Sequence, residues 1–450
     1  METNGAEGGA SRTEAAQTGD SRTVTIRTGA SPTDAAGTGT PMTSRQRVLT
    51  ALNHDEPDRV PLDLGGTIMS GIMAHALDRL RRHLGLEPRP VKIYEVFQML
   101  GEVEMDLVER LGIDVLPVEP PVQFFGLRRE GWKPWRLWDG TEVLVPGQFE
   151  VEVDERGDWL LHTEGDPKRP VEGRMPKGGY YFDMPVLTES HYDFVPPSLD
   201  QIRRESHLGS EDLEFLAARA EALRRDTDKA LLLGCWDKVG LPWVGSIPDF
   251  LVLQALDPGY VRDLFAVRTE TALDNLARLA RYLGDNIDIL GLDGTDYGSQ
   301  NAELFSPESF KKLYVPFFRR QNDWVHEHTS WKTWLHSCGS ITGILPALVE
   351  TGLDILNPVQ TSAAGMDPQW LKAEFGDRLT FWGGGIDTQK TLPFGTPEQV
   401  AEQVRERVRI FAPGGGFVFN TIHNIQQDIP PENIVAAYDT ARTAGTYPVG

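Results

Sequence analysis

Cysteine is almost absent from this chain of 450 residues, which contains only Cys235 and Cys338. Two cysteines cannot build the network of disulfide bonds that holds small secreted proteins together. A disulfide-stapled fold is therefore excluded. The scarcity is also typical of proteins in a reducing compartment, so we expect a cytoplasmic location.

Positive charge is also in short supply. Lysine and arginine together number 44 against 66 aspartates and glutamates, which gives a formal net charge of −22 at pH 7. A surface this acidic repels phosphate groups, so nucleic acid is excluded as a partner. Apolar runs long enough to span a membrane and the basic-then-apolar order of a secretory signal are missing, so we expect no membrane partner either.

Large apolar side chains are scarce in residues 1–42, which are rich in Gly, Ala, Ser and Thr. Such a segment cannot bury enough surface to offset the entropy lost on ordering. We therefore predict a disordered, low-complexity tail over residues 1–42, followed by one folded region over residues 43–445.

In the folded region, short apolar runs alternate with segments of helical periodicity. The runs that precede a helix number eight, and they begin near residues 60, 113, 230, 287, 331, 353, 379 and 416. Eight βα units predict an α/β fold of the (β/α)8 TIM-barrel class. No G-x-G-x-x-G turn follows a first strand, which argues against a dinucleotide-binding fold.

The region from about residue 122 to residue 190 has a different character, with many aromatic residues and short alternating runs such as TEVLV, FEVEV and WLLHT. Alternation with a period of two favours antiparallel strands. We predict an antiparallel β-rich insertion after the second strand, covering one end of the barrel. Its tryptophans, Trp132, Trp135 and Trp138, are candidates for substrate selection, and the alternative is that they form the core of the insertion.

Polar residues stand at or beside nearly every predicted strand. They are Asp63, Asp114, Asp237, Asp293 with Asp296, His336 with Cys338, Asn357 with Gln360, Asp387, and His423. In a (β/α)8 barrel the carboxyl ends of the strands converge on one mouth, where catalytic residues gather. The set as a whole predicts an active site there. The alternative for any single aspartate is that it caps the following helix or pairs with a lysine.

The segment WKTWLHSCGS, residues 331–340, is the strongest local signal. A buried strand that ends at His336 and is followed by Cys338 presents an imidazole and a thiol on the same side, because residues i and i+2 of an extended chain face the same way. This predicts part of a metal site, although zinc needs at least three protein ligands. The alternative is a hydrogen-bonded histidine beside an inert buried cysteine.

Two glycine clusters, residues 383–385 and 414–416, flank the seventh and eighth strands. Glycines there offer backbone donors and close approach to a ligand, and barrels often bind phosphate near these strands. The alternative is that the glycines only permit tight turns. The residues we predict to bind a cofactor are Gly384, Gly385, Asn357 and Gln360.

Five segments together resemble one known family: RQRVLTALNHDEPDRVPLDLGGT, GLPWVGSIPDF, LFSPESFKKLYVPFF, the HSCG corner, and NTIHNIQQDIPPENI. They are similar to the uroporphyrinogen decarboxylase superfamily, and the resemblance extends over about residues 43–445. This superfamily consists of (β/α)8 barrels and contains decarboxylases of heme synthesis and cobalamin-dependent methyltransferases. The resemblance therefore implies an enzyme with the same fold that the strand count predicts.

The methyltransferase branch of this superfamily holds zinc with a His-x-Cys pair and a later cysteine in an APGCG-type loop. His336 and Cys338 match the pair, but the loop here reads Ala412, Pro413 and three glycines, so the later cysteine is missing. The resemblance implies zinc, with a third ligand from elsewhere: His423 first, Asp296 or Glu303 next, and Cys235 last. The alternative is a site without metal.

The decarboxylase branch places arginines of an MRQAGRY-type motif after the first strand, because its substrate is a polycarboxylate. Here the matching segment reads LGGTIM, and the first arginine after it is Arg79. The element NTIHNIQQDIPPE resembles the NLGHG-type element of the family, which aligns His423 with the decarboxylase histidine.

The resemblance thus favours a zinc- and corrinoid-dependent methyltransferase acting on a small methylated substrate, and the alternative is a metal-free decarboxylase of uroporphyrinogen or another carboxylate. The chain shows no Asp-x-His-x-x-Gly cobalamin motif, so the corrinoid is expected on a partner protein. A homodimer is a further expectation from the family. The expected roles are metal ligands His336, Cys338 and His423, and catalytic residues His423, Asp293 and Asp296.

Overall fold

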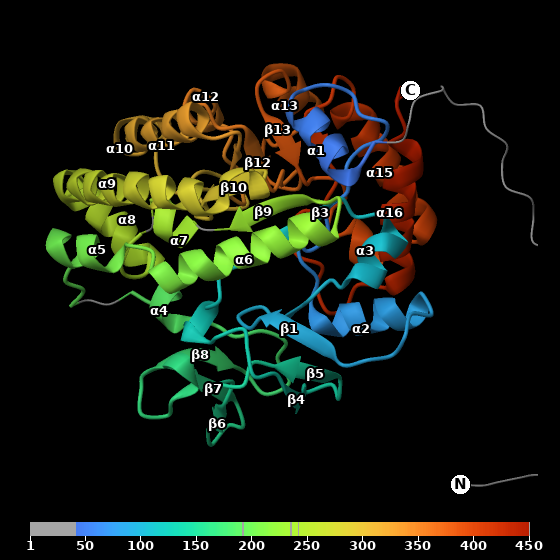
Figure 1. Ribbon diagram of the computed structural model, residues 1–450. Coiled ribbons are helices and arrows are strands. Elements are labelled where there is room, and N and C mark those ends of the chain that lie inside the picture. The colour runs from blue at the N-terminus through green and yellow to red at the C-terminus, as the bar shows by residue number, and fades with distance from the viewer. Residues whose placement is uncertain (1–41, 191–192, 235, 242, 450) are drawn as a thin grey trace, which may run out of the picture. The chain divides into compact units, whose positions relative to one another are not determined.

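A sheet of parallel strands forms the centre of the computed structural model, which describes residues 42–190, 193–234, 236–241 and 243–449 (Figure 1). Its seven strands are arranged in the order β14-β13-β12-β11-β10-β9-β3. Their bounds are β3 (Val115–Val118), β9 (Ala230–Gly234), β10 (Ile289–Asp293), β11 (Lys332–His336), β12 (Ile355–Asn357), β13 (Thr380–Trp382) and β14 (Phe417–Val418). Each corresponds to one of the predicted runs.

The first predicted strand, around Leu62, lies between the two edges of this sheet. Leu62 forms a parallel bridge with Phe419, beyond β14, and the Asp63 amide donates to the Phe419 carbonyl at 2.9 Å. On the other side the amide of Asp114, beside β3, donates to the Leu62 carbonyl at 2.8 Å. The segment therefore links both edges, and the predicted TIM-barrel-like α/β fold is confirmed.

Every second side chain along the strands points into the barrel, and these side chains fill its interior. One buried cluster collects an inward-facing side chain from each strand of the sheet: Val115, Leu232, Ile289, Trp334, Ile355, Trp382 and Val418. Helix α1 (Ser44–Leu52) adds Val48 and Leu52 to this cluster from the amino-terminal end of the barrel. Thr43 begins α1 with a capping box in which its side chain and that of Gln46 each accept from the other residue's amide.

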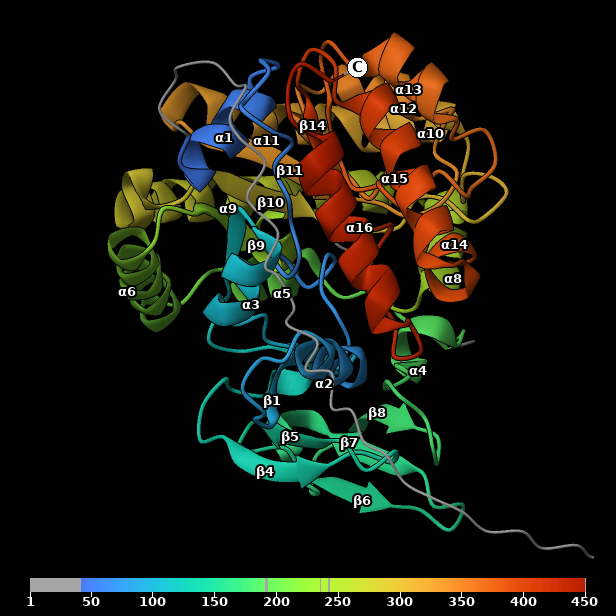
Figure 2. The same cartoon turned by 90° about the vertical axis from the view of Figure 1, so that its right-hand side faces the viewer.

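Helices flank the sheet, and α15 (Pro397–Phe411) and α16 (Pro431–Ala444) lie side by side outside its last strands (Figure 2). Two long helical stretches are each divided: residues 198–226 contain α5 and α6, and residues 307–326 contain α10 and most of α11. The remaining helices, with these, are α2 (Ala74–His83), α3 (Met105–Leu111), α4 (Pro185–Thr188), α5 (Leu199–Glu205), α6 (Ser210–Asp226), α7 (Trp236–Val239), α8 (Ile247–Leu256), α9 (Pro258–Leu283), α10 (Pro307–Leu313), α11 (Val315–His328), α12 (Leu345–Val349), α13 (Pro368–Phe375), α14 (Thr391–Phe394), α15 (Pro397–Phe411) and α16 (Pro431–Ala444).

Two small sheets form the β-rich insertion, with strand orders β2-β1-β5-β4 and β6-β7-β8 (Figure 1). Their strands are β1 (Val91–Glu95), β2 (Leu100–Gly101), β4 (Lys133–Arg136), β5 (Glu142–Val145), β6 (Val151–Val153), β7 (Trp159–His162) and β8 (Val171–Met175). The insertion is antiparallel as predicted except where β1 pairs in parallel with β5. The strands β1 and β2 precede the predicted insertion and were not predicted.

The tryptophans of the insertion mostly pack against one another and other aromatic rings. Trp138 stacks on Trp159 with ring centroids 4.4 Å apart, and Trp135 meets the edges of Phe149 and Trp159. Trp132 differs, because the Lys92 ammonium lies 4.6 Å from its ring centroid. For Trp135 and Trp138 the structure therefore agrees with a core role.

Three aspartates mark the amino-terminal rim of the barrel. Asp114, Asp288 and Asp354 come directly before β3, β10 and β12, in the related segments GIDVL, NIDIL and GLDIL. The prediction that Asp114 belongs to the mouth was wrong, because it lies before β3 and accepts from Arg47 and Arg59. The glycines 414–416 also precede their strand, and the Gly416 amide donates to the Ala51 carbonyl of α1 at 2.8 Å.

None of the helices among the described residues combines the length and the apolar character needed to cross a lipid bilayer. The predicted tail, apart from Met42, falls outside the described residues, as do Cys235 and the side chain of Asp237.

Candidate metal centre at the barrel mouth

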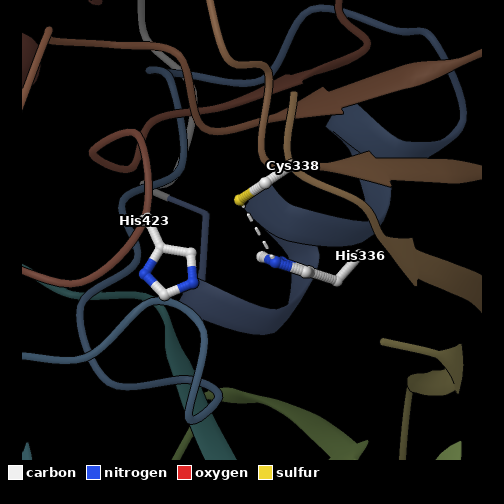
Figure 3. A group of neighbouring side chains, drawn as sticks. All are labelled: His336, Cys338 and His423. Atoms are coloured by element: carbon white, nitrogen blue, oxygen red, sulfur yellow. Dashed lines mark hydrogen bonds between the residues drawn. The ribbon is translucent and has the colours of Figure 1, made fainter. Parts of the chain in front are cut away.

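Three of the predicted residues meet where the strands end (Figure 3). His336 is the last residue of β11, Cys338 follows two residues later, and His423 lies in the segment after β14. The Cys338 sulfur lies 3.5 Å from Nε2 of His336, and the two imidazole centroids are 5.2 Å apart. One ligand atom from each residue lies within 4.8 Å of the other two. The structure thus joins the His-x-Cys pair to the first choice for a third ligand.

The turn after His336 is held by hydrogen bonds to its backbone. The Cys338 amide donates to Oδ1 of Asp296 at 2.7 Å, and the Gly339 amide donates to Oε1 of Gln360 at 2.7 Å. Gly339 has φ of +92°, and a Cβ there would lie 2.3 Å from the Gly298 backbone. Only glycine fits this left-handed, crowded position. The glycine permits the tight turn that leaves the Cys338 sulfur 3.5 Å from Nε2 of His336.

His423 also has a left-handed backbone, with φ of +71°. This conformation costs a non-glycine residue about 1 kcal/mol, so neighbouring contacts must support it. The next residue, Asn424, is buried and bonds three ways: Oδ1 accepts from the Gly71 amide, and Nδ2 donates to the Ile68 carbonyl and to Gln98. Asn424 therefore ties the histidine segment to the loop that follows the first barrel strand.

Burial sets the charge of the cluster. It lowers the pKa of His336 to about 4, and burial together with the nearby His336 lowers the pKa of His423 to about 4. Both rings are therefore neutral at pH 7 and have a lone pair for a metal. Burial, reinforced by the Asp296 carboxylate, raises the pKa of the Cys338 thiol well above its usual range. Without a metal, the thiol holds its proton.

The donor set fits a zinc ion. Zinc prefers imidazole nitrogen and thiolate sulfur, and tetrahedral coordination at ordinary bond lengths places neighbouring ligand atoms about 3.3–3.6 Å apart. The separation of 3.5 Å between the Cys338 sulfur and His336 already meets this value. The three ligand atoms all lie within 4.8 Å of one another, so a side-chain movement of about 1 Å would bring them to zinc-binding distances.

The two predicted catalytic aspartates occupy different places. Asp296 lies at the rim, with half of its side chain exposed, and its Oδ1 is 3.5 Å from Nε2 of His336. Asp293 is buried and accepts from the amides of Leu241 and Thr295 and from the Tyr297 hydroxyl. Burial raises the pKa of the Asp293 carboxyl. Asp293 therefore organises the loop around the cluster, whereas Asp296 faces it.

The residues predicted to bind a cofactor make other contacts. A Cβ on Gly384 would lie 2.7 Å from the Val359 carbonyl, and the Gly385 amide already donates to the Asn420 carbonyl at 3.0 Å. Asn357 bonds to His336, and Gln360 bonds to the Gly339 amide. Among the remaining candidates, Glu303 accepts from the Gly343 amide, and Asp387 accepts from the amide of Gln389.

Glu119 was not among the predicted site residues. It directly follows β3, so it stands on the same rim as His336, Cys338 and His423. Oε2 lies 3.3 Å from Nη2 of Arg129, while Oε1 is buried and has no hydrogen-bond partner among the described residues. Burial raises the pKa of Glu119, and Arg129 opposes that shift. Its position directly after the run IDVLPV could have indicated a place at the barrel mouth. The prediction took Asp114, at the start of that run, instead.

Comparisons with known proteins agree with this architecture. Residues 264–444 match the family described as uroporphyrinogen decarboxylase (URO-D). Uroporphyrinogen decarboxylase of Psychromonas ingrahamii is 34% identical over 89 residues, which are 20% of this chain and 23% of that protein. The same enzyme from Thioalkalivibrio sulfidiphilus is 32% identical over 249 residues, 52% of this chain and 66% of that protein. The chain thus spans less than two thirds of either relative.

A methylated-thiol–coenzyme M methyltransferase of Methanosarcina mazei is 26% identical over 139 residues, 31% of this chain and 34% of that protein. A solved structure of a methyltransferase from the same organism superposes with a TM-score of 0.51 at 14% identity, covering 89% of this chain and 98% of that one. This likeness bears on the fold alone. The family match leads to one conclusion: residues 264–444 carry a domain of the uroporphyrinogen decarboxylase family.

Proposed function

We propose that this protein is a zinc-dependent methyltransferase that moves a methyl group between a small methylated substrate and a corrinoid on a separate protein. The observation that carries the proposal is the convergence of His336, Cys338 and His423 at the barrel mouth. The similarity to a methyltransferase that acts on methylated thiols favours a thiol or thioether as the small substrate.

The side chains of the cluster would divide the work as follows. His336, Cys338 and His423 would hold the zinc ion, which lowers the pKa of a bound thiol and so supplies a nucleophile at neutral pH. Asp296 stands at the exposed rim beside His336, where its carboxylate can take the proton that the thiol loses. Asp293 and Gln360 keep the surrounding turns in place through their hydrogen bonds.

Decarboxylation is the second candidate, and it is favoured by the names of the relatives with the higher identities. A polycarboxylate substrate needs guanidinium partners. The loop from Leu64 to Met73, which Asn424 ties to the His423 segment, contains no arginine. Arg79 already donates to the carbonyls of Gln427 and Ile429. The structure therefore offers little positive charge for such a substrate in this loop.

The test uses free methylcobalamin as the methyl donor and a panel of small thiols, including coenzyme M, under anaerobic conditions. The zinc-loaded protein is expected to speed demethylation of methylcobalamin, followed by cobalamin absorbance, by about 100-fold or more over buffer. The methyl carbon leaves cobalt with both bonding electrons remaining on cobalt, and it joins the thiol sulfur as the thiol loses its proton. The Cys338→Ala protein is the control and is expected to match buffer.

Failure with every thiol by a fully zinc-loaded protein would count against methyl transfer to thiols. Release of carbon dioxide from uroporphyrinogen by the metal-free protein would instead favour the decarboxylase.

Zinc binding at pH 7 is expected to release about one proton per ion, because only the Cys338 thiol is protonated in the metal-free cluster. Both histidines, with pKa values of about 4, are already neutral. The apparent zinc affinity should therefore rise about tenfold per pH unit between about pH 5 and the pKa of the thiol. Calorimetric titrations in two buffers of different ionisation enthalpy measure the proton count. Zero protons would indicate a preformed thiolate, and two or three would indicate charged histidines.

A further inference from the structure

Three neighbouring strands of the barrel end in residues that form a chain of hydrogen bonds from one strand to the next. His336 ends β11, Asn357 ends β12, and Trp382 ends β13, and the register of the sheet pairs His336 directly with Asn357. Nδ1 of His336 lies 2.7 Å from Oδ1 of Asn357, and Nδ2 of Asn357 donates to the Trp382 carbonyl at 3.0 Å. Both His336 and Asn357 are buried.

This arrangement determines which nitrogen of His336 carries its proton. The Trp382 carbonyl can only accept a hydrogen bond, so it must face the amide nitrogen of Asn357. The amide oxygen must then face Nδ1 of His336, and because this oxygen can only accept, Nδ1 must donate. A neutral imidazole with its proton on Nδ1 has its lone pair on Nε2, the nitrogen that lies 3.5 Å from the Cys338 sulfur.

We propose that Asn357 is a positioning residue that fixes the Nδ1–H tautomer of His336 and so directs the Nε2 lone pair into the metal cluster. The sheet itself enforces this, since the Trp382 carbonyl belongs to the backbone. The assignment replaces the predicted role of Asn357 in binding a cofactor. The consequence for zinc rests on the proposed function, whereas the tautomer does not.

Further contacts restrain both members of the pair. His336 stacks near Trp334, with ring centroids 6.0 Å apart at 28°, and the edge of the His423 ring faces it. Asn357 receives a second restraint, because its carbonyl accepts from the Ser337 amide at 2.7 Å. Loss of such a partner behind a metal-binding histidine typically lowers metal affinity 10–100-fold.

The first experiment measures the tautomer in the metal-free wild-type protein by two-bond proton–nitrogen correlation of 15N-labelled histidine. The His336 signals are assigned by their loss in a His336→Gln variant. We expect a pyrrole-type Nδ1 and a pyridine-type Nε2 at pH 7. The opposite pattern, or a mixture of both tautomers, would overturn the proposal without any bearing on the reaction.

The second experiment compares zinc affinity in three variants. Asn357→Leu removes the acceptor at similar volume, and we expect the affinity to fall 10–100-fold and the His336 signals to show both tautomers. Asn357→Asp keeps an oxygen facing Nδ1, and its second oxygen can donate to the Trp382 carbonyl when the buried carboxyl is protonated. We therefore expect it to retain the wild-type tautomer and an affinity within about threefold of wild type. Asn433→Leu is the matched control, because Asn433 is a buried amide that donates to the carbonyls of Leu392 and Gly395.

Asn433→Leu is expected to lower stability and leave zinc affinity unchanged. Equal loss of affinity in Asn357→Leu and Asn433→Leu would show a general structural effect and overturn the positioning role. Should Asn357→Leu fail to fold, the wild-type tautomer and the Asn357→Asp protein decide the matter. Absence of zinc binding by the wild type, together with the Nδ1–H tautomer, would contradict the proposed function and leave the tautomer assignment standing.

Discussion

A double variant, His336→Ala with Cys338→Ala, is expected to reduce bound zinc from about one ion per chain to less than about 0.1. The change leaves His423 as the last member of the cluster, and one histidine does not retain zinc through purification. Elemental analysis of protein purified at neutral pH without chelators gives the zinc content directly. His423→Ala alone leaves two ligands, so we expect it to lose most of the metal as well.

A matched control for these variants is His328→Ala. His328 is an exposed residue at the end of α11, and its ring contacts Trp324 of the same helix rather than the cluster. Its zinc content should equal that of the wild type. Zinc that persists in the double variant would place the metal elsewhere. Absence of zinc from the wild type would contradict the metal mechanism and favour a decarboxylase centred on His423.

The barrel was predictable because its strands are short, apolar and bounded by turns. GFVFNT and LDILNP can be placed as strands from composition alone, since fully buried parallel strands have few polar residues. The parallel strand β1 could not, because VKIYE is short and depends on pairing with β5, about fifty residues later in the chain. Asp114 was assigned to the wrong rim because periodicity locates a strand only to within a few residues.

The candidate metal site depends in the same way on both local and distant parts of the sequence. The spacing of His336 and Cys338 on one extended segment is a local property and correctly brings them together. His423 follows the last strand, about ninety residues later in the chain. Its place at a strand end was predictable, but its pairing with His336 and Cys338 came only from the resemblance to a known family. The role of Asn357 depends on the Trp382 carbonyl of a third strand. A hydrogen-bond network across three strands leaves no pattern in the sequence of any one of them.

Asp114→Ala is expected to lower the free energy of unfolding by about 3–5 kcal/mol, which is a large share of the stability of a typical domain. Asp114 is fully buried and accepts from Arg47 at 2.7 Å, from Arg59 at 2.7 and 3.0 Å, and from the Leu62 amide at 2.9 Å. Removing the carboxylate leaves two guanidinium groups with less compensating charge and one amide without its partner. The amide belongs to the Leu62 segment, which links the two edges of the sheet, so its loss weakens the closure of the barrel.

Urea unfolding followed by circular dichroism measures this effect, with Asp377→Ala as the control. Asp377 is also paired with an arginine, Arg378, but 78% of its side chain is exposed, so its removal should change the free energy by less than about 0.5 kcal/mol. Arg47 keeps Asp58 as a second partner, and Arg59 still donates to the carbonyls of Val60 and Gly112. These remaining bonds keep the loss from exceeding about 5 kcal/mol. Equal effects of the two substitutions would show that burial of Asp114 adds nothing to the pairing, and the closure of the barrel would then rest on the apolar contacts around Leu62.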